Sequence, residues 1–116
     1  MRLKLLMIIP LSIALLSVKS AKPTIKNAKT ETVKVYGNCG MCEKTIEGAA
    51  NQKKKVEADW DKTTKMLTVT YDQKATNLDD ILQKIADSGY DSDKFRASDE
   101  KYQQLHGCCK YERPNK

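Results

Sequence analysis

Four cysteines are the most reactive residues of this 116-residue chain, and they fall into two groups. Cys39 and Cys42 form a Cys-x-x-Cys pair within YGNCGMCEKTIEG at 36–48, and Cys108 and Cys109 are adjacent within LHGCCKYER at 105–113. Such thiols can hold a soft metal ion, exchange electrons as a dithiol, or close a structural disulfide. The choice among these chemistries depends on the elements that position the two groups.

The Cys-x-x-Cys pair lies between a predicted strand and a predicted helix. Val33 and Val35 alternate with polar residues before it, and apolar residues recur at helical spacing after it, beginning with Ile46. Cys42 is therefore expected at or near the first helical turn, where free N–H groups and the helix dipole favour an anion. A thiolate there has a lowered pKa. Two thiolates satisfy Cu(I) better than Zn(II), which normally takes four ligands.

The apolar pattern of the whole chain predicts the order β-α-β-β-α-β, followed by an extra C-terminal helix. The expected strands cover 32–36, 55–60, 67–71 and 90–96, and the expected helices cover 42–54, 78–88 and 99–106. Thr76 with Asp79, or Asn77 with Asp80, can cap the second helix, and Gly89 ends it. This order is typical of an α+β ferredoxin-like sandwich, with a four-stranded antiparallel sheet and two helices on one face.

The predicted core comes from the apolar faces of these elements and contains no cysteine. Its members are Val33, Val35, Ile46, Ala49, Val56, Ala58, Leu67, Val69, Leu78, Ile81, Leu82 and Ile85. Four cysteines in an exported chain would normally suggest disulfides. Because the segment 32–90 can bury a core unaided, we expect a fold that needs no disulfide.

Residues 32–91 resemble a heavy-metal-associated domain, the family of copper chaperones and of the periplasmic mercury-binding protein. The matching features are Cys39-x-x-Cys42, the Ile46-Glu47 pair after it, and IADSGYD at 85–91. The resemblance implies that the loop of Cys39 and Cys42 receives a metal ion and passes it to a partner by ligand exchange, without enzyme chemistry. The implied partner is a metal-transporting P-type ATPase or another CxxC metal-exchange protein. Tyr90 would lie near the loop and influence access, or be a partly buried aromatic at the helix end.

The loop departs from the family pattern Gly-Met-x-Cys-x-x-Cys. Gly37-Asn38-Cys39 is one residue shorter, and the family methionine is missing from its usual place. Met41 lies between the cysteines instead. We expect Met41 to fill the core, and the alternative is that it borders the metal ion as a soft neighbour.

The second cysteine group adds candidate ligands outside the family domain: His106, Cys108 and Cys109. A strand of about 16 Å leads away from the loop, and a helix of about 12 Å over 99–106 can bring the chain back. Three interpretations stay open. These residues complete the loop's metal site or form a second one, they enter a disulfide within the tail or with the loop, or the tail is inert or faces a partner.

The chain divides into a signal peptide at 1–20, a flexible lead at 21–31, the heavy-metal-associated domain at 32–97 and a C-terminal helix with a Cys/His tail at 98–116. Cleavage after Ser20 would give a periplasmic or secreted protein without stable membrane association. It would also lower the net charge from +6 to about +3. The remaining charges are interspersed, so we expect no nucleic-acid partner.

The sequence thus predicts an exported, non-enzymatic protein that carries or sequesters a soft metal ion. Cu(I) is the first choice, with Hg(II), Zn(II) and Cd(II) as alternatives. Because the loop is expected to be exposed, two copies of the chain could also share one metal ion as a homodimer. The rival hypothesis is a thiol–disulfide oxidoreductase using the CGMC dithiol. It lacks the cis-proline that thioredoxin-like proteins place opposite the dithiol, because after the signal peptide only Pro23 and Pro114 remain, both in end segments. A purely disulfide-stapled structural domain is the third hypothesis.

Overall fold

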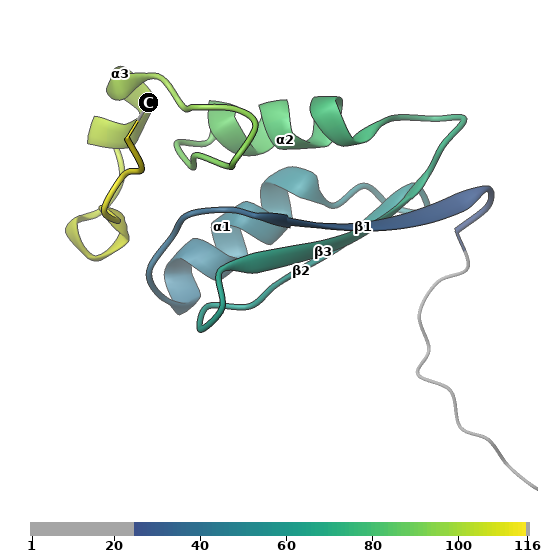
Figure 1. Cartoon of the computed structure of the whole chain (residues 1–116), viewed down its shortest axis with the longest axis horizontal. Coiled ribbons are helices and arrows are strands. Elements are labelled where there is room, and N and C mark those ends of the chain that lie inside the picture. The colour runs from purple at the N-terminus through teal and green to yellow at the C-terminus, as the bar shows by residue number, and fades with distance from the viewer. Residues whose placement is uncertain (1–24, 116) are drawn as a thin grey trace, which may run out of the picture.

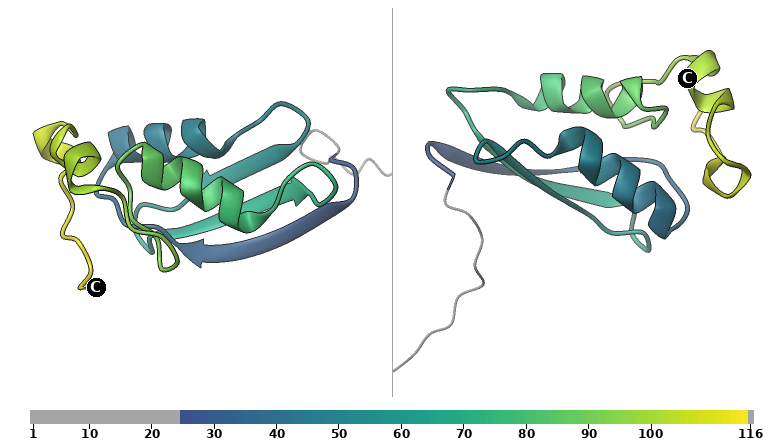
Figure 2. Two further views of the ribbon diagram at one scale, coloured as in Figure 1. Left: turned by 90° about the horizontal axis from the view of Figure 1, so that it is seen from above. Right: turned by 180° about the vertical axis from the view of Figure 1, so that it is seen from behind.

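The computed structural model describes residues 25–115 of the chain, so the predicted signal peptide and its cleavage site lie outside the described residues. Its elements are β1 (Ala28–Lys34), α1 (Gly40–Ala50), β2 (Val56–Trp60), β3 (Met66–Asp72), α2 (Leu78–Asp87), α3 (Asp99–Gln103) and a 3₁₀ turn, η1 (Gly107–Cys109). The two longer helices lie side by side on one face of the sheet, as Figures 1 and 2 show. None of the helices within 25–115 is long and apolar enough to span a bilayer.

Within the described residues the sheet has three antiparallel strands in the order β1-β3-β2, so the class is α+β and the expected fourth strand is missing. The segment 90–96 contributes only a single bridge, between Val35 and Ser92. The chain turns directly after this bridge, because the Ser92 hydroxyl accepts hydrogen bonds from the N–H groups of Lys94 and Phe95. The side chain of Ser92 thus competes with strand extension.

Strand β1 begins at Ala28, four residues before the expected start, so residues 28–31 are not part of a flexible lead. They pair with β3 from Asp72 to Val69, and the hydroxyls of Thr30 and Thr70 are 2.8 Å apart. This end of β1 has little buried surface, and its sequence, AKTE, lacks the alternation that predicts a half-buried strand.

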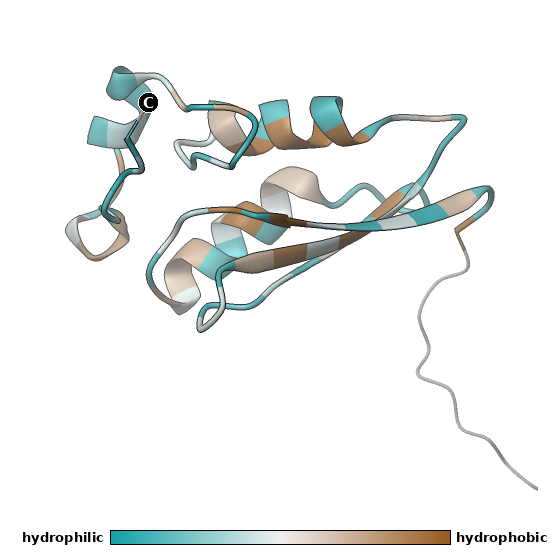
Figure 3. Ribbon diagram, in the orientation of Figure 1, coloured by the Kyte–Doolittle hydropathy of each residue, from teal (hydrophilic) through white to brown (hydrophobic). Residues whose placement is uncertain are grey.

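Helix α2 begins and ends largely as the sequence predicts. The side chain of Asn77 accepts a hydrogen bond from the N–H of Asp80 at 2.8 Å, which caps the helix. Gly89 follows the helix with φ +104°, a conformation that favours glycine. The apolar side of α2 faces α1 and the sheet in Figure 3. Helix α1 ends at Ala50, earlier than expected, before the lysines at 53–55.

The core contains nine of the twelve predicted residues as buried side chains, while Val33, Ala49 and Leu78 are partly buried at its edge. The prediction that the core contains no cysteine is wrong. Cys42 and Cys109 are both buried, together with four aromatic residues that the pattern did not assign to it: Trp60, Tyr71, Tyr90 and Tyr111.

The C-terminal segment folds back against the end of the domain where α1 begins (Figure 1). Ser98 caps α3, as predicted, by accepting a hydrogen bond from the N–H of Lys101. The helix ends at Gln103 rather than continuing to His106. The turn η1 then carries Cys108 and Cys109 back to the loop.

Candidate metal centre

The Cys-x-x-Cys loop is shaped by the aromatic residue beneath it. Cys39 is the N-cap of α1, with extended backbone at φ −138° and ψ −175°, and Cys42 lies in the first helical turn. Gly37 passes so close to Trp60 that an added Cβ would lie 3.0 Å from its ring. The indole N–H donates to the carbonyl of Val35 at 2.9 Å. Trp60 therefore supports the shortened loop from inside the core.

The start of α1 acidifies the thiol of Cys39. Its Sγ faces the start of α1, where the backbone N–H groups of Cys42 and Met41 donate to it and lower its pKa to about 7. Hydrogen bonds to the charged form stabilise a thiolate. Because the side chain is only partly buried, a nucleophilic and metal-binding thiolate is accessible near neutral pH.

Cys42 faces inward. Its side chain has no exposed surface, and its Sγ accepts a hydrogen bond from the N–H of Asn38 at 3.3 Å. The two loop sulfur atoms are 4.0 Å apart. The predicted pair thus converges, one thiol at the surface and one in the core.

The tail brings two more thiols to the same place. The Sγ of Cys108 is 3.9 Å from that of Cys39, and the Sγ of Cys109 is 3.9 Å from that of Cys108. All three sulfur atoms lie within 4.8 Å of one another. The side-chain amide of Asn38 donates to the carbonyl of Cys108 at 3.4 Å, which joins tail and loop directly. All four cysteines are free thiols.

Met41 does not lie where expected, and His106 lies apart from the close sulfur atoms. Met41 does not fill the core: it is 47% exposed, with its Sδ 3.9 Å from the Sγ of Cys108. It is therefore a soft neighbour of the thiol group, the cluster formed by Cys39, Cys42, Cys108 and Cys109. His106 is exposed and does not belong to the group of close ligand atoms, although its carbonyl accepts from the N–H of Cys109 at 2.8 Å.

Tyr90 lies beneath the thiol group and contacts its two buried members, Cys42 and Cys109. It is buried at the end of α2, and its pKa is raised by burial and by hydrogen bonds with Cys109 and Cys42. Burial, with a hydrogen bond to Cys42, also raises the pKa of Cys109 to about 12. The metal-free site therefore has an acidic outer thiol, Cys39, and a protonated inner thiol, Cys109.

The tail is anchored beyond the cysteines by Tyr111, whose ring packs between the rings of two other tyrosines. It stacks on Tyr90 at a centroid distance of 5.7 Å and meets Tyr102 edge-on at 5.0 Å. Its hydroxyl donates to the carbonyl of Gly89 at 2.8 Å and accepts from the N–H of Asp91 at 2.9 Å. Tyr111 thereby holds Cys109, two residues before it, near the end of α2.

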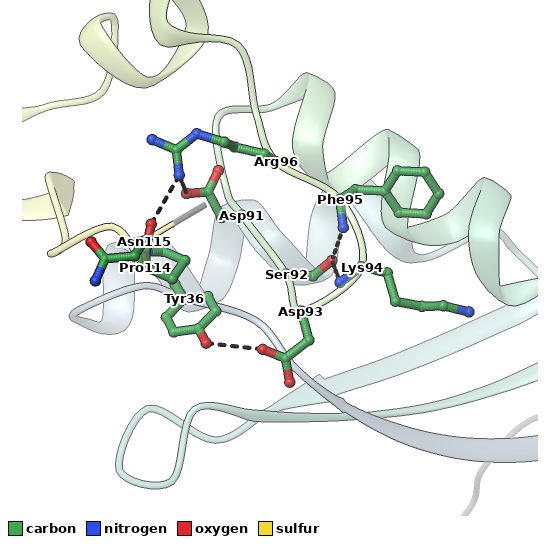
Figure 4. Close-up of a pocket in the computed structure, with 9 residues that line it drawn as sticks. All are labelled: Tyr36, Asp91, Ser92, Asp93, Lys94, Phe95, Arg96, Pro114 and Asn115. Atoms are coloured by element: carbon green, nitrogen blue, oxygen red, sulfur yellow. Dashed lines mark hydrogen bonds and ion pairs between the residues drawn. The ribbon is translucent and has the colours of Figure 1, made fainter.

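The last residues of the tail line a pocket of about 270 Å³ beside the 91–96 segment (Figure 4). Arg96 donates to the carbonyl of Pro114 at 3.0 Å and lies 3.9 Å from the Asp91 carboxylate. On the opposite wall the hydroxyl of Tyr36 donates to Asp93 at 2.9 Å. No thiol lines this pocket, and the contact between Arg96 and Pro114 holds the end of the tail there.

Three carboxylates gather where α1 packs against β2. Oxygens of Glu43, Glu47 and Asp59 lie within 4.8 Å of one another. Glu47 already accepts a hydrogen bond from the N–H of Trp60 at 2.8 Å, which ties α1 to β2. Burial, together with the charges of the other two carboxylates, raises the pKa of Glu47. This arrangement serves the packing of the helix.

No protein-family model matches the chain, and no curated protein matches it. Two solved structures do. The CopZ metallochaperone has a TM-score of 0.52 and 30% identity, covering 55% of this chain and 98% of its own. A Bacillus anthracis str. Ames protein described as copper-ion-binding has the same TM-score and identity, covering 56% and 94%.

The chain belongs to the heavy-metal-associated domain family. It contains nearly the whole length of both structural relatives, and more than two fifths of its residues have no counterpart in them. Its cysteines form a group that could hold a metal ion, on a fold shared with a metallochaperone.

Sequence patterns missed three residues that shape this site: Trp60, Tyr111 and Arg113. Arg113 holds the tail by donating hydrogen bonds to the buried carboxylate of Asp91. Trp60 ends an alternating run on the same face as Val56 and Ala58, so the alternation indicated that its side chain would be buried. Tyr111 and Arg113 lie in a polar tail without periodicity, and only the folded chain reveals their contacts.

Proposed function

We propose that this protein is an exported carrier of Cu(I), which it binds through Cys39 and Cys42. The observation that carries the proposal is the pair of sulfur atoms 4.0 Å apart at the start of α1, with the outer thiol partly exposed and acidified by two backbone N–H groups. A preformed thiolate at the surface can accept a soft ion without first losing a proton to bulk solvent at neutral pH.

Copper is favoured over the alternatives by the donor set and by the relatives. Sulfur ligands select soft ions, and Cu(I) is satisfied by fewer of them than Zn(II), which prefers four-coordinate sites. The two structural relatives are a metallochaperone and a protein described as copper-ion-binding. Hg(II), Zn(II) and Cd(II) remain competitors for the same sulfur atoms.

The proposed partner is a metal-transporting P-type ATPase or another protein with a CxxC loop, including a second copy of this chain. Transfer would occur by stepwise exchange of thiolate ligands, a route that needs at least one accessible sulfur. Cys39 and the exposed Met41 lie at the accessible edge of the loop. Export to the periplasm or medium rests on the N-terminal segment 1–20, and an N-terminus at Ala21 in protein purified from its native cells would test it.

The function can be tested by titrating anaerobically purified, reduced protein with Cu(I) against a chromogenic Cu(I) chelator. We expect one tightly bound ion per chain, a large loss of affinity in Cys39→Ser, and unchanged binding in Lys44→Gln, an exposed neighbour without a sulfur atom. Binding no tighter than micromolar for both Cu(I) and Zn(II) would refute the proposal. Catalytic turnover of a disulfide substrate would favour the oxidoreductase instead.

A further inference from the structure

The spacing of the four sulfur atoms suits more than two ligands on one metal ion. For a metal–sulfur bond of about 2.3 Å, sulfur ligands stand about 4.6 Å apart in a linear site, about 4.0 Å in a trigonal site and about 3.8 Å in a tetrahedral site. The three successive pairs from Cys42 through Cys39 and Cys108 to Cys109 are 4.0, 3.9 and 3.9 Å apart. These distances match trigonal coordination. The sulfur atoms of Cys39, Cys108 and Cys109 lie within 4.8 Å of one another, and that of Cys42 lies beside this set, 4.0 Å from the Sγ of Cys39.

The tail thiols are held beside the loop by contacts within the protein. Arg113 pairs with the buried carboxylate of Asp91, and Tyr111 is bonded to the backbone at the end of α2. Asn38 of the loop then contacts the carbonyl of Cys108. The fold therefore presents Cys108 and Cys109 to the loop in advance, which removes most of the ordering cost of recruiting them as ligands.

We propose that Cys108 and Cys109 join Cys39 and Cys42 as ligands to the same soft metal ion, and that the tail retains this ion until an acceptor displaces it. This proposal rests on the proposed function and deepens it. A two-thiolate loop releases its cargo readily, whereas two additional thiolates on a docked tail act as a second binding module. Linking such modules raises overall affinity by about 10²–10⁴-fold.

The exposed side of the site determines which ligand an acceptor thiol replaces first. Cys108 and Met41 are exposed, whereas Cys42 and Cys109 are buried. An acceptor thiol gives up its proton and forms a metal–sulfur bond as the bond from the metal to the Sγ of Cys108 breaks. The Cys108 thiolate takes up a proton, and the oxidation state of the ion does not change. The tail can then lift away and expose the remaining ligands.

The deciding variant is Cys108→Ser, because an exposed residue can lose its sulfur without disturbing the core. His106→Ala is the matched control: it removes another exposed tail ligand that lies outside the thiol group. Each full-length protein would be loaded with Cu(I) under anaerobic conditions. The number of sulfur ligands would be measured by X-ray absorption, the affinity by chelator competition, and the rate of transfer to a chelating acceptor by absorbance.

We expect three or more sulfur ligands in the unaltered protein, fewer in Cys108→Ser, and an affinity at least about 10-fold lower with faster transfer in that variant. His106→Ala should behave like the unaltered protein. Two sulfur ligands in both the unaltered protein and Cys108→Ser, with equal affinities, would overturn the tail proposal alone. Failure of the unaltered protein to bind Cu(I) would overturn the proposed function as well. Equal melting temperatures of the metal-free forms would establish that the variants are folded.

Discussion

Arg113 donates two hydrogen bonds of 2.9 Å, one to each carboxylate oxygen of Asp91, a residue without exposed surface. The same carboxylate accepts from the N–H of Ala97 at 2.7 Å, and Arg113 also donates to the carbonyl of Ala97. A residue three positions from the C-terminus is thus bonded to the end of the metal-binding domain. This pair fixes the tail, and with it the two distal thiols.

Replacing Arg113 by Gln should leave the Asp91 carboxylate buried without its main partner. Breaking a buried ion pair by removing one member typically costs about 3–5 kcal/mol. Arg96 is the matched control, because it lies 3.9 Å from the same carboxylate but is far more exposed. Arg96→Gln should cost less than about 1 kcal/mol. Urea denaturation checks both values, and equal losses would contradict the assigned role of Arg113.

The stability of the metal-free protein should fall in acid because of Asp91. Burial acts to raise the pKa of this carboxyl, but hydrogen bonds from Arg113 and the Ala97 N–H outweigh it, so the pKa is lowered. The resulting stability is present above the unfolded pKa of about 3.9 and is lost as pH falls through the lower folded value. Unfolding free energies measured from pH 7 to pH 2 should show this loss. The slope should flatten in Asp91→Asn.

Cys39 should react with iodoacetamide near neutral pH. Because the thiolate is the nucleophile, the rate should rise with pH through the pKa of about 7 and level off above it. Cys109, with its pKa raised to about 12, should stay unmodified over this range. Mass spectrometry of the digested protein identifies the modified site. A midpoint above pH 8.5, or its persistence in Cys39→Ser, would show that the helix start does not acidify this thiol.

Replacing Cys42 by Ser should destabilise the metal-free fold, contrary to the expectation of a core free of cysteine. A hydroxyl in this buried position exchanges apolar contact for a polar group and costs about 1–3 kcal/mol. Cys108→Ser, at an exposed position, should change stability by less than about 0.5 kcal/mol. Thermal melts of the two reduced proteins make the comparison. Indistinguishable melts would place Cys42 outside the packed core.

Replacing Gly37 by Ala should strain the loop against Trp60. The new Cβ would lie 3.0 Å from the indole ring and 3.2 Å from the Cβ of Cys42, and overpacking of this kind costs about 1–3 kcal/mol. Gly48 has open space and lies within α1, so Gly48→Ala should instead stabilise by about 0.5–1 kcal/mol. Trp60 is the sole tryptophan of the chain, and its fluorescence reports unfolding in both variants.

The sequence predicted the parts of the fold that depend on local pattern. The alternation around Val69 and the apolar stripe of Ile81, Leu82 and Ile85 placed a strand and a helix correctly, because burial of one face imposes the period of the element. Asn77 and Gly89 marked the ends of α2 for local reasons of capping and backbone conformation. The prediction of a fourth strand was wrong because the Ser92 side chain ends the pairing after a single bridge.

Part of the candidate site could also be predicted from local sequence, and part of it could not. The spacing of Cys39 and Cys42 at a helix start determined on its own that two thiols converge, because adjacent turns of one element bring them together. The approach of Cys108 and Cys109, the exposure of Met41 and the exclusion of His106 from the thiol group were decided by tertiary structure. They depend on Tyr111 and on the Asp91–Arg113 pair, contacts between residues about twenty positions apart. Contacts at that separation have no period, so only the folded chain could reveal how its four thiols meet.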